Sequence, residues 1–308
     1  MAIASGSGRQ IAYTAESVFG AVPATPTWKV LRTTGGTLRT NKGTVVSDEV
    51  RADRNVSDEL MVSQDVTGSY PFEFSFGTFD DLLEAALCGT WAGNVVKNGI
   101  VQRSLSFEER LDLGGGAFSF SRFDGCQVNA LSLALNTRGL ITGSVDLMGQ
   151  NETLDTGIVA GATYTAANTK QVQTSSTGVA GLTLAGGAAK IRQLSLQINN
   201  NMRTRPLVGS LFTDSFGYGR ADITGSAQFY FENNALYQQV LNHGGGAINF
   251  TVGSVANEKY VFSLPNCRFL DGERAPGGIT DDAMVTIPFR AIFDGASGAS
   301  IQITRAVA

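Results

Sequence analysis

Hydrophobic and polar residues alternate along most of this chain. Aromatic or aliphatic side chains recur at every second position in stretches such as Tyr70–Phe76, Leu131–Leu135, Leu194–Ile198, Ile248–Val252 and Tyr260–Leu264. Successive side chains of a β-strand point to opposite faces of a sheet, so this period of two predicts strands with one buried face. Clusters of Gly, Asn and Asp separate the stretches, as hairpins and loops require. The pattern predicts a mainly β protein.

Two stretches have the spacing of a helix instead. Apolar residues recur three and four positions apart over Phe79–Leu87, which predicts an amphipathic helix with Thr78 as its N-cap. A second helix is expected from about Ala235 to Asn242, with Asn233 or Asn234 as its N-cap.

The two predicted helices belong to a pattern that occurs twice. Val66-Thr-Gly-Ser69 leads into the first helix, and Ile223-Thr-Gly-Ser226 leads into the second. The match extends in both directions: Leu31–Leu38 corresponds to Ile191–Ile198, and Phe118–Ser121 with Cys126 corresponds to Tyr260–Ser263 with Cys267. Self-similarity of this kind indicates an internal repeat. We expect two copies of one β fold in the chain, each with one flanking helix.

The repeat divides the chain into five parts. These are an N-terminal arm (1–24), a first copy (25–150), a connector or added hairpin (151–187), a second copy (188–296) and a C-terminal arm (297–308). The connector is rich in Thr, Ala, Gly and Ser and carries almost no charge, which favours a partly ordered link between the copies.

Each copy contains a long polar stretch between its first two strands, predicted to be a loop. Asn41–Asp65 is mainly acidic, whereas Asn199–Asp222 is slightly basic. The charged residues singled out here are Asp48, Glu49, Arg51, Asp53 and Arg54 in the first stretch and Arg203 and Arg205 in the second. Two solvated loops are the commoner arrangement. The alternative is that the stretches meet across a subunit interface, where complementary charge fixes the register of the partners. Loops of this length usually have a function.

Composition narrows the classes of function. Charged residues make up only 16% of the 308 residues and 37 are Gly, a mixture that suits β-structure with extensive protein–protein contact. The formal net charge of −4 argues against nucleic-acid binding through a basic patch. Three Cys give no disulfide framework. Neither a secretory signal nor an apolar run of about 18 residues is evident, so no membrane contact is expected.

The residues that usually carry chemistry are scarce or scattered. His243 is the single His and is expected to interact with the dipole of the second helix. The Cys residues lack metal-binding spacing, and no Gly-rich segment has the pattern of a phosphate loop. The acid pairs Glu108-Glu109 and Asp281-Asp282 would point to opposite faces of a strand and are expected to be solvated. We predict no enzyme activity, no cofactor and no metal site.

Several segments together resemble the tail tube proteins of long-tailed bacteriophages. These segments are Tyr13–Pro26, Trp28–Arg32, Glu49–Arg54, Gly77–Ala86, Phe123–Cys126 and Asn129–Leu133. The resemblance implies a tail-tube-type β-sandwich or barrel with a flanking helix, polymerised as stacked rings around a channel for DNA ejection. It also implies a place in the virion after assembly in the host bacterial cytoplasm. The implied partners are the chain itself, a tape measure protein and a tail terminator, with DNA passing unbound.

The repeat adds an expected stoichiometry. Rings of this family present six copies of the fold, so three chains with two copies each would form a pseudo-sixfold ring; a ring of six chains stays open. Two other structural roles are alternatives: a β-rich receptor-binding protein or adhesin, and a capsid decoration protein. An enzyme with an unusual carboxylate site, using Glu108 or Asp281, is a further alternative.

Overall fold

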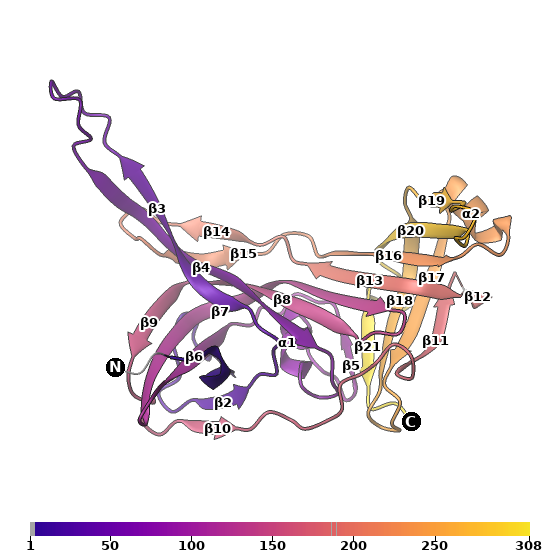
Figure 1. The fold of residues 1–308 in the computed structure, drawn as a ribbon, viewed down its shortest axis with the longest axis horizontal. Helices are drawn as coiled ribbons and strands as arrows, with labels where there is room; N and C mark the ends of the chain where they lie inside the picture. The colour runs from indigo at the N-terminus through magenta and orange to yellow at the C-terminus, as the bar shows by residue number, and fades with distance from the viewer. Residues whose placement is uncertain (1–3, 186, 189) are drawn as a thin grey trace.

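The computed structural model describes residues 4–185, 187–188 and 190–308. Residues 1–3 of the predicted N-terminal arm, 186 of the connector and 189 of the second copy lie outside the described residues. The prediction of a mainly β protein is confirmed. Figure 1 shows two β-rich halves side by side, with one hairpin projecting far from the first.

Twenty-one strands, two α-helices and one short 3-10 helix make up the described part of the chain. The first half contains η1 (Gly6–Gly8), β1 (Arg9–Ala15), β2 (Thr27–Val30), β3 (Thr37–Val46), β4 (Glu59–Glu73), α1 (Asp80–Ala86), β5 (Val95–Lys97), β6 (Leu105–Gly114), β7 (Ala117–Asn136), β8 (Thr142–Gly149) and β9 (Asn151–Asp155). The rest contains β10 (Thr163–Thr165), β11 (Val179–Leu184), β12 (Gly187–Ala188), β13 (Ile191–Asn199), β14 (Arg203–Pro206), β15 (Thr213–Gly217), β16 (Asp222–Tyr230), α2 (Asn234–Leu241), β17 (Gly245–Val252), β18 (Tyr260–Phe269), β19 (Glu273–Ala275), β20 (Met284–Ala291) and β21 (Gln302–Arg305).

The longest strand, β7, connects the two layers of the first half. Its N-terminal part pairs with β6 and β9, and its C-terminal part pairs with β8 and β13. Gly125 lies near the change of layer with φ +61°, a left-handed conformation that glycine adopts without strain. Strand β18 has a similar role in the second half. It pairs with β17 along most of its length, with β21 at its N-terminal end and with β20 at its C-terminal end.

The predicted arms and connector contribute strands to these sheets. In the N-terminal arm, β1 pairs along its whole length with β6, and Ile11 and Tyr13 are buried. In the connector, β9 extends the first half and β11 pairs with β17 of the second. In the C-terminal arm, β21 lies between β18 and β5 and so joins the two halves.

One hydrophobic core runs through both halves. Alternate residues of β4 supply its aromatic centre, where Phe72 stacks on Phe79 with ring centroids 4.1 Å apart. Leu82 and Leu83 of α1 are fully buried against this centre. The apolar stripe predicted for the first helix is therefore the face that α1 buries.

The two helices end in the same way. The residue after the last turn has a positive φ in each, Cys88 at 48° and His243 at 49°. The amide of the following glycine then donates to a carbonyl five residues back, as in a Schellman motif. His243 is thus the left-handed residue of this motif.

The beginnings of the helices differ. Asn233 caps α2 through its side chain, which accepts from the amide of Ala235 at 2.9 Å. The cap predicted for α1 is wrong: Phe79 stands at the N-cap without a side-chain bond, and the Thr78 hydroxyl contacts Ser75 instead. Asp80 and Asp81 in the first turn supply the negative charge that a helix N-terminus favours.

Candidate assembly surfaces

A continuous sheet crosses from the first half of the chain to the second. The C-terminal part of β7 pairs antiparallel with β13 along seven residues. Facing aliphatic pairs in this ladder are Leu131–Ile198, Leu133–Leu196 and Leu135–Leu194, all at most 5% exposed. This seam joins two edge strands through backbone hydrogen bonds over a buried apolar face, which removes both edges from solvent.

The order of strands is the same on the two sides of the seam. In the first half β3, β4, β8 and β7 lie side by side. The corresponding order in the second half is β13, β16, β20 and then β18 together with β19. Both Thr-Gly-Ser glycines stand in the middle of three strands: Gly68 faces Leu38 and Leu147, and Gly225 faces Leu196 and Phe289.

This pairing shifts the sequence alignment of the first strands by two residues. Leu38 corresponds to Leu196, because each lies opposite the glycine of its Thr-Gly-Ser motif, and not to Ile198 as the sequence comparison had it. A shift of two leaves every side chain on the same face of the strand, so the hydrophobic pattern does not reveal it. Within the repeated segment Leu31–Leu38, strand β3 begins only at Thr37, after two glycines with positive φ.

Two strands of this order, β3 and β19, each leave one edge without a strand partner among the described residues. β3 pairs only with β4, and β19 pairs only with β20. They lie at opposite ends of the strand order that the seam joins. On β3, the amide of Leu38 points away from β4 and donates to the carboxylate of Glu109 at 3.1 Å. The edge beyond Leu38 faces solvent, with Arg39 exposed.

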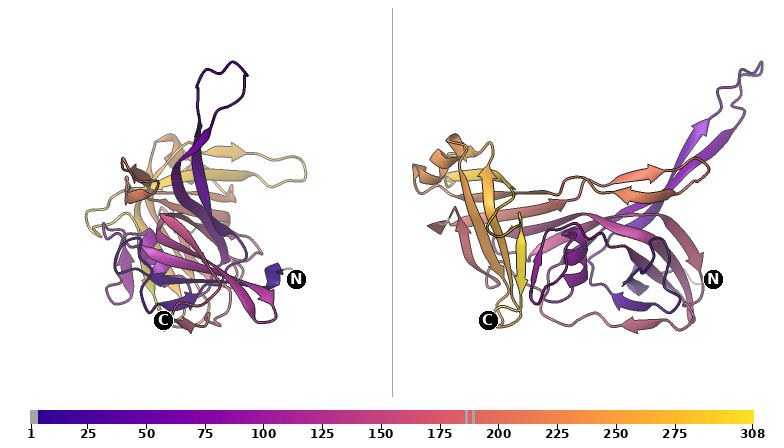
Figure 2. Two further views of the ribbon diagram at one scale, coloured as in Figure 1. Left: turned by 90° about the vertical axis from the view of Figure 1, so that its left-hand side faces the viewer. Right: turned by 180° about the vertical axis from the view of Figure 1, so that it is seen from behind.

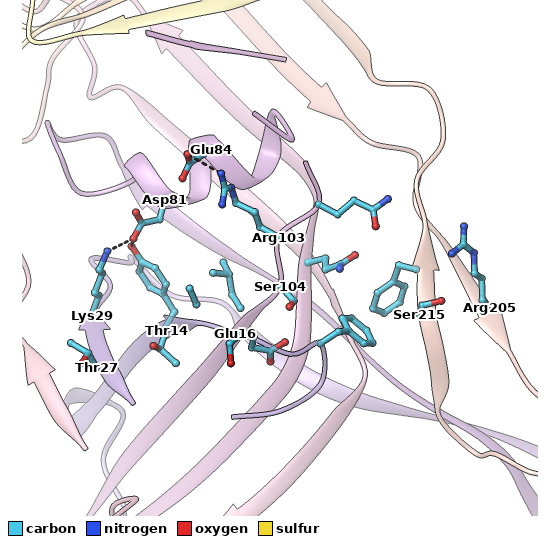
Figure 3. Close-up of a pocket in the computed structure, with 18 residues that line it drawn as sticks. Thr14, Glu16, Thr27, Lys29, Asp81, Glu84, Arg103, Ser104, Arg205 and Ser215 are labelled. Atoms are coloured by element: carbon cyan, nitrogen blue, oxygen red, sulfur yellow. Dashed lines mark hydrogen bonds and ion pairs between the residues drawn. The ribbon is translucent and has the colours of Figure 1, made fainter. Parts of the chain in front are cut away.

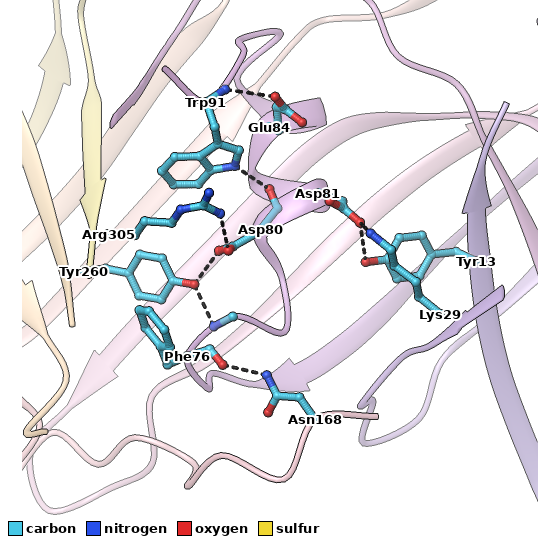
Figure 4. Close-up of polar contacts among 11 residues, drawn as sticks. Tyr13, Lys29, Phe76, Asp80, Asp81, Glu84, Trp91, Asn168, Tyr260 and Arg305 are labelled. Atoms are coloured by element: carbon cyan, nitrogen blue, oxygen red, sulfur yellow. Dashed lines mark hydrogen bonds and ion pairs between the residues drawn. The ribbon is translucent and has the colours of Figure 1, made fainter. Parts of the chain in front are cut away.

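Polar contacts around the start of α1 hold the halves together (Figure 4). Arg305 of β21 donates to Asp80 at 2.6 Å, and its guanidinium lies 4.3 Å from the ring centre of Trp91. Tyr260 of β18 also donates to Asp80 and accepts from the amide of Gly77 at 2.8 Å. Burial and the carboxylate of Asp80 raise the pKa of Tyr260, which keeps this hydroxyl a donor. These contacts join β18 and β21 of the second half to α1 of the first.

The hairpin of β14 and β15 lies across the first half of the chain. Asn200 at its base donates to the carbonyls of Ala86 at 3.1 Å and Val128 at 2.9 Å, and so covers the end of α1. Further out, Phe216 meets Phe19 edge to face with ring centroids 5.9 Å apart. Figure 1 shows the hairpin reaching over β7 and β8 towards β3 and β4.

A cavity of about 700 Å³ lies beneath this hairpin (Figure 3). Tyr13, Glu16, Glu84, Arg103 and Arg205 line it, and Glu84 pairs with Arg103 at 3.0 Å. The described residues include no group of three or more His, Cys, Asp or Glu side chains arranged to hold a metal ion.

A family model described as phage tail tube protein matches residues 6–291. The chain belongs to this family. It is therefore a structural protein of the phage tail, as the sequence resemblance predicted. No curated protein matches the chain. None of the described helices is long and apolar enough to cross a membrane.

The acidic stretch Asn41–Asp65 of this tail tube protein is a hairpin arm and not the loop predicted for it. β3 continues to Val46 and β4 begins at Glu59, because Val and Leu residues favour strands on both sides. The charged residues singled out in the sequence lie between them, at the tip: Asp48, Glu49, Arg51, Asp53 and Arg54. Hereafter, the arm means residues 41–65.

Charge at the tip of the arm is partly paired locally. Arg51 binds Asp53 at 2.9 Å, and this contact lowers the pKa of the Asp53 carboxyl. Arg54 has φ +60°, which turns the chain. Among the described residues, no ion pair joins the tip to Arg203 or Arg205, which lie on β14 with their guanidinium groups beside Gly217.

The arm and the second hairpin do meet, but through their backbones. The amide of Gln64 in β4 donates to the carbonyl of Leu211 at 2.8 Å. The contact therefore joins the base of the arm to the tip of the hairpin within one chain. The sequence offered no signal for it, because neither residue carries charge.

Glu108 and Glu109 point to opposite faces of β6 as expected, but neither is solvated. Glu108 is 1% exposed and pairs with Arg122 at 2.8 Å, while Tyr164 donates to its other oxygen at 2.5 Å. Glu109 is 9% exposed and pairs with Arg9 at 2.7 Å. Arg122 lies opposite Glu108 on the next strand, β7, and Arg9 lies on β1, far earlier in the chain. The pattern along β6 alone shows neither partner, which is why it suggested exposure.

The three Cys residues are buried, as expected for small hydrophobic side chains. Burial raises the pKa of the Cys88 thiol to about 11 and that of Cys267 to about 12. Cys126 and Cys267 occupy matching places on β7 and β18, where each strand leaves its first partner pair. They fill the core and carry no reactive thiolate at neutral pH.

Proposed function

We propose that three copies of this chain form a ring, and that the rings stack into the tube through which phage DNA is ejected. Membership of the tail tube family supports the tube. The observation that carries the ring is the seam between β7 and β13, together with the repeated order of strands on either side of it. An internal duplication of one fold accounts for both.

The unpaired edges give the geometry of ring closure. Within one chain, the edge of β7 pairs with β13 of the second half. In the second half, β18 together with β19 occupies the position of β7. By analogy, the edge of β19 would pair with β3 of the next chain. Three chains then bring six copies of the fold into one closed sheet. Closure pairs the open edges of β3 and β19, which would otherwise promote disordered aggregation.

The seam also predicts the register between chains. Ser132 of β7 faces Gln197 of β13. Ser132 pairs with Ser144 of β8, and Glu273 pairs with Thr286, at the equivalent position of β20. Glu273 is therefore the residue of the second half that corresponds to Ser132. Arg39 takes the place of Gln197, because each follows the leucine opposite a Thr-Gly-Ser glycine.

Arg39 would then face Glu273 of the next chain. Both residues are exposed, and neither forms an ion pair with a described residue of its own chain. Opposite charges facing each other across two strands stabilise the pair and select its register. The proposed neighbour thus supplies what each of these side chains lacks.

Partners beyond the ring follow from the same role. The tip of the arm, with Asp48, Glu49, Arg51, Asp53 and Arg54, extends past the body of the protein and would contact another subunit or the adjacent ring. A tape measure protein inside the tube and a terminator at its end complete the set. The net charge of −4 suits a channel that DNA crosses without binding.

Disulfide trapping tests the ring. A variant with both Arg39→Cys and Glu273→Cys places thiols at directly opposed positions, where two Cβ atoms are about 4.5–5.5 Å apart. We expect oxidation to give bands of one, two and three chains on a non-reducing gel, with nothing beyond three. The native thiols are buried and should not contribute.

Matched controls come from the chain itself. Ser132→Cys with Gln197→Cys should close a disulfide within one chain and leave a monomer band. Either single cysteine of the first pair should give no trimer. A ladder that continues to six chains would refute the three-chain ring, and monomers at every concentration would refute edge pairing altogether. A small oligomer that never elongates would instead favour a capsid decoration protein.

A further inference from the structure

The arm exposes apolar side chains on both faces of its hairpin. Val45 and Leu60 face each other across β3 and β4 on one face and are 55% and 58% exposed. Val46 and Met61 follow them on the opposite face and are 46% and 39% exposed. Figure 2 shows the arm rising away from both halves of the chain. A two-stranded hairpin with exposed aliphatic residues is only marginally stable in water, so this segment needs a partner surface.

The second half shows where such a hairpin binds. The chain between β13 and β16 occupies the same place in the second half as the arm in the first, and both begin with Asn and end with Asp: Asn41 faces Asp65, and Asn199 faces Asp222. That second hairpin lies flat across the first half. Phe216 and Thr213 are buried there, and Gln150 donates to the carbonyl of Thr213 at 2.7 Å.

The surface that would receive the arm is bare in a single chain. Asn200 covers the end of α1, where Ala86 is 1% exposed. Leu241 stands at the same place in α2, three residues before the glycine that ends each helix, and is 63% exposed. Phe293, which follows β20 in the same half, is 67% exposed. The base of the second hairpin covers the end of α1, whereas the end of α2 is left exposed among the described residues.

We propose that the arm docks on the second half of the neighbouring chain in the same ring, with Lys42 over the C-terminal end of α2. Lys42 stands in the place of Asn200, because each follows the Asn of the matching pair. A lysine ammonium at a helix C-terminus meets the unpaired carbonyls and the negative end of the helix dipole. The arm thus binds laterally, and only its tip is left to reach another ring. This inference rests on the proposed ring.

The backbone of the arm allows the required bend. Asn201, at the corner where the second hairpin turns across the first half, has φ +46°. Gly43 stands in the same place in the arm, and the register of β3 against β4 shifts between Gly43 and Thr44. Glycine adopts a positive φ without a Cβ penalty, so the straight arm can bend there on docking.

Disulfide trapping with Lys42→Cys and Leu241→Cys tests the lateral contact. We expect oxidation to link chains into closed trimers, with no band above three. An arm that binds the adjacent ring would instead join chains along the tube and give a ladder without an upper limit. The intramolecular control is Asn200→Cys with Ala86→Cys, which copies the contact seen within one chain and should leave a monomer.

The variant with Arg39→Cys and Glu273→Cys distinguishes failure of the lateral arm from failure of the ring. If that pair closes trimers while Lys42→Cys with Leu241→Cys gives none, or gives an unlimited ladder, the lateral arm is refuted and the ring stands. If neither pair links chains, the ring itself is refuted, and the lateral arm with it. Val45→Ser in the arm should weaken the new crosslink, and Val208→Ser at the exposed tip of the second hairpin should not.

Discussion

A methyl group added at either Thr-Gly-Ser glycine should destabilise the protein. On Gly68, a Cβ would lie 2.8 Å from Cα of Leu38 and still closer to the carbonyl oxygen of Thr37. On Gly225, it would lie 2.9 Å from Cε2 of Phe289 and still closer to the carbonyl of Ser195. The carbonyl contacts are 2.1 Å and 2.2 Å, whereas ordinary Cβ contacts are 3.4–4 Å, so the strands must separate by about 1.2 Å or more.

Overpacking of this kind costs about 1–3 kcal/mol, and more where backbone must move. At about 2–4 °C per kcal/mol, each Gly→Ala variant should lower the melting temperature by roughly 2–12 °C. The measurement is thermal unfolding followed by circular dichroism. Gly295→Ala is the control, because nothing lies within 4 Å of its added methyl. If Gly68→Ala and Gly225→Ala melt like this control, the close approach of three strands at each motif is wrong.

Three further predictions concern charge. Arg122→Met leaves the carboxylate of Glu108 buried and unpaired, so unfolding in urea should show a loss of about 3–5 kcal/mol, largely recovered when Glu108→Leu is added. Burial raises the pKa of the Asp124 carboxyl to about 6, above the ordinary value of 3.8. The folded state therefore holds this proton more tightly than the unfolded state, and stability should fall as pH rises from about 4 to about 6. Asp124→Asn should flatten this part of the melting-temperature profile; an unchanged slope would contradict the assignment. Arg39→Glu and Glu273→Arg should each reduce ring assembly in light scattering and the double variant should restore it; no rescue would contradict the proposed register.

Alternation along the chain predicted strands well where one face is buried and the other is not. β4, β13, β17 and β18 all lie where the period of two placed them. The same period hid the two-residue shift between Leu38 and Leu196, because register along a strand is set by its partners and not by its own pattern. Pairing in the structure was needed to align the two halves.

Polar stretches were harder to interpret. The arm contains acids at its tip and strand-forming Val and Leu residues on both sides, and the acids dominated the prediction of a loop. Glu108 and Glu109 were expected in solvent because the pattern along one strand does not show the ion pairs that they form with Arg122 of β7 and Arg9 of β1. Contacts between distant strands decide whether a carboxylate is exposed or paired, and a single sequence does not contain them.

The rotational symmetry of the assembled tube tests the central claim most directly. Electron cryo-microscopy of tubes formed by this chain should show threefold rings in which six similar lobes alternate between first and second halves. The mass per ring should equal three chains of 32.4 kDa. Strict sixfold symmetry with six chains per ring, or a compact monomer that never assembles, would contradict the account.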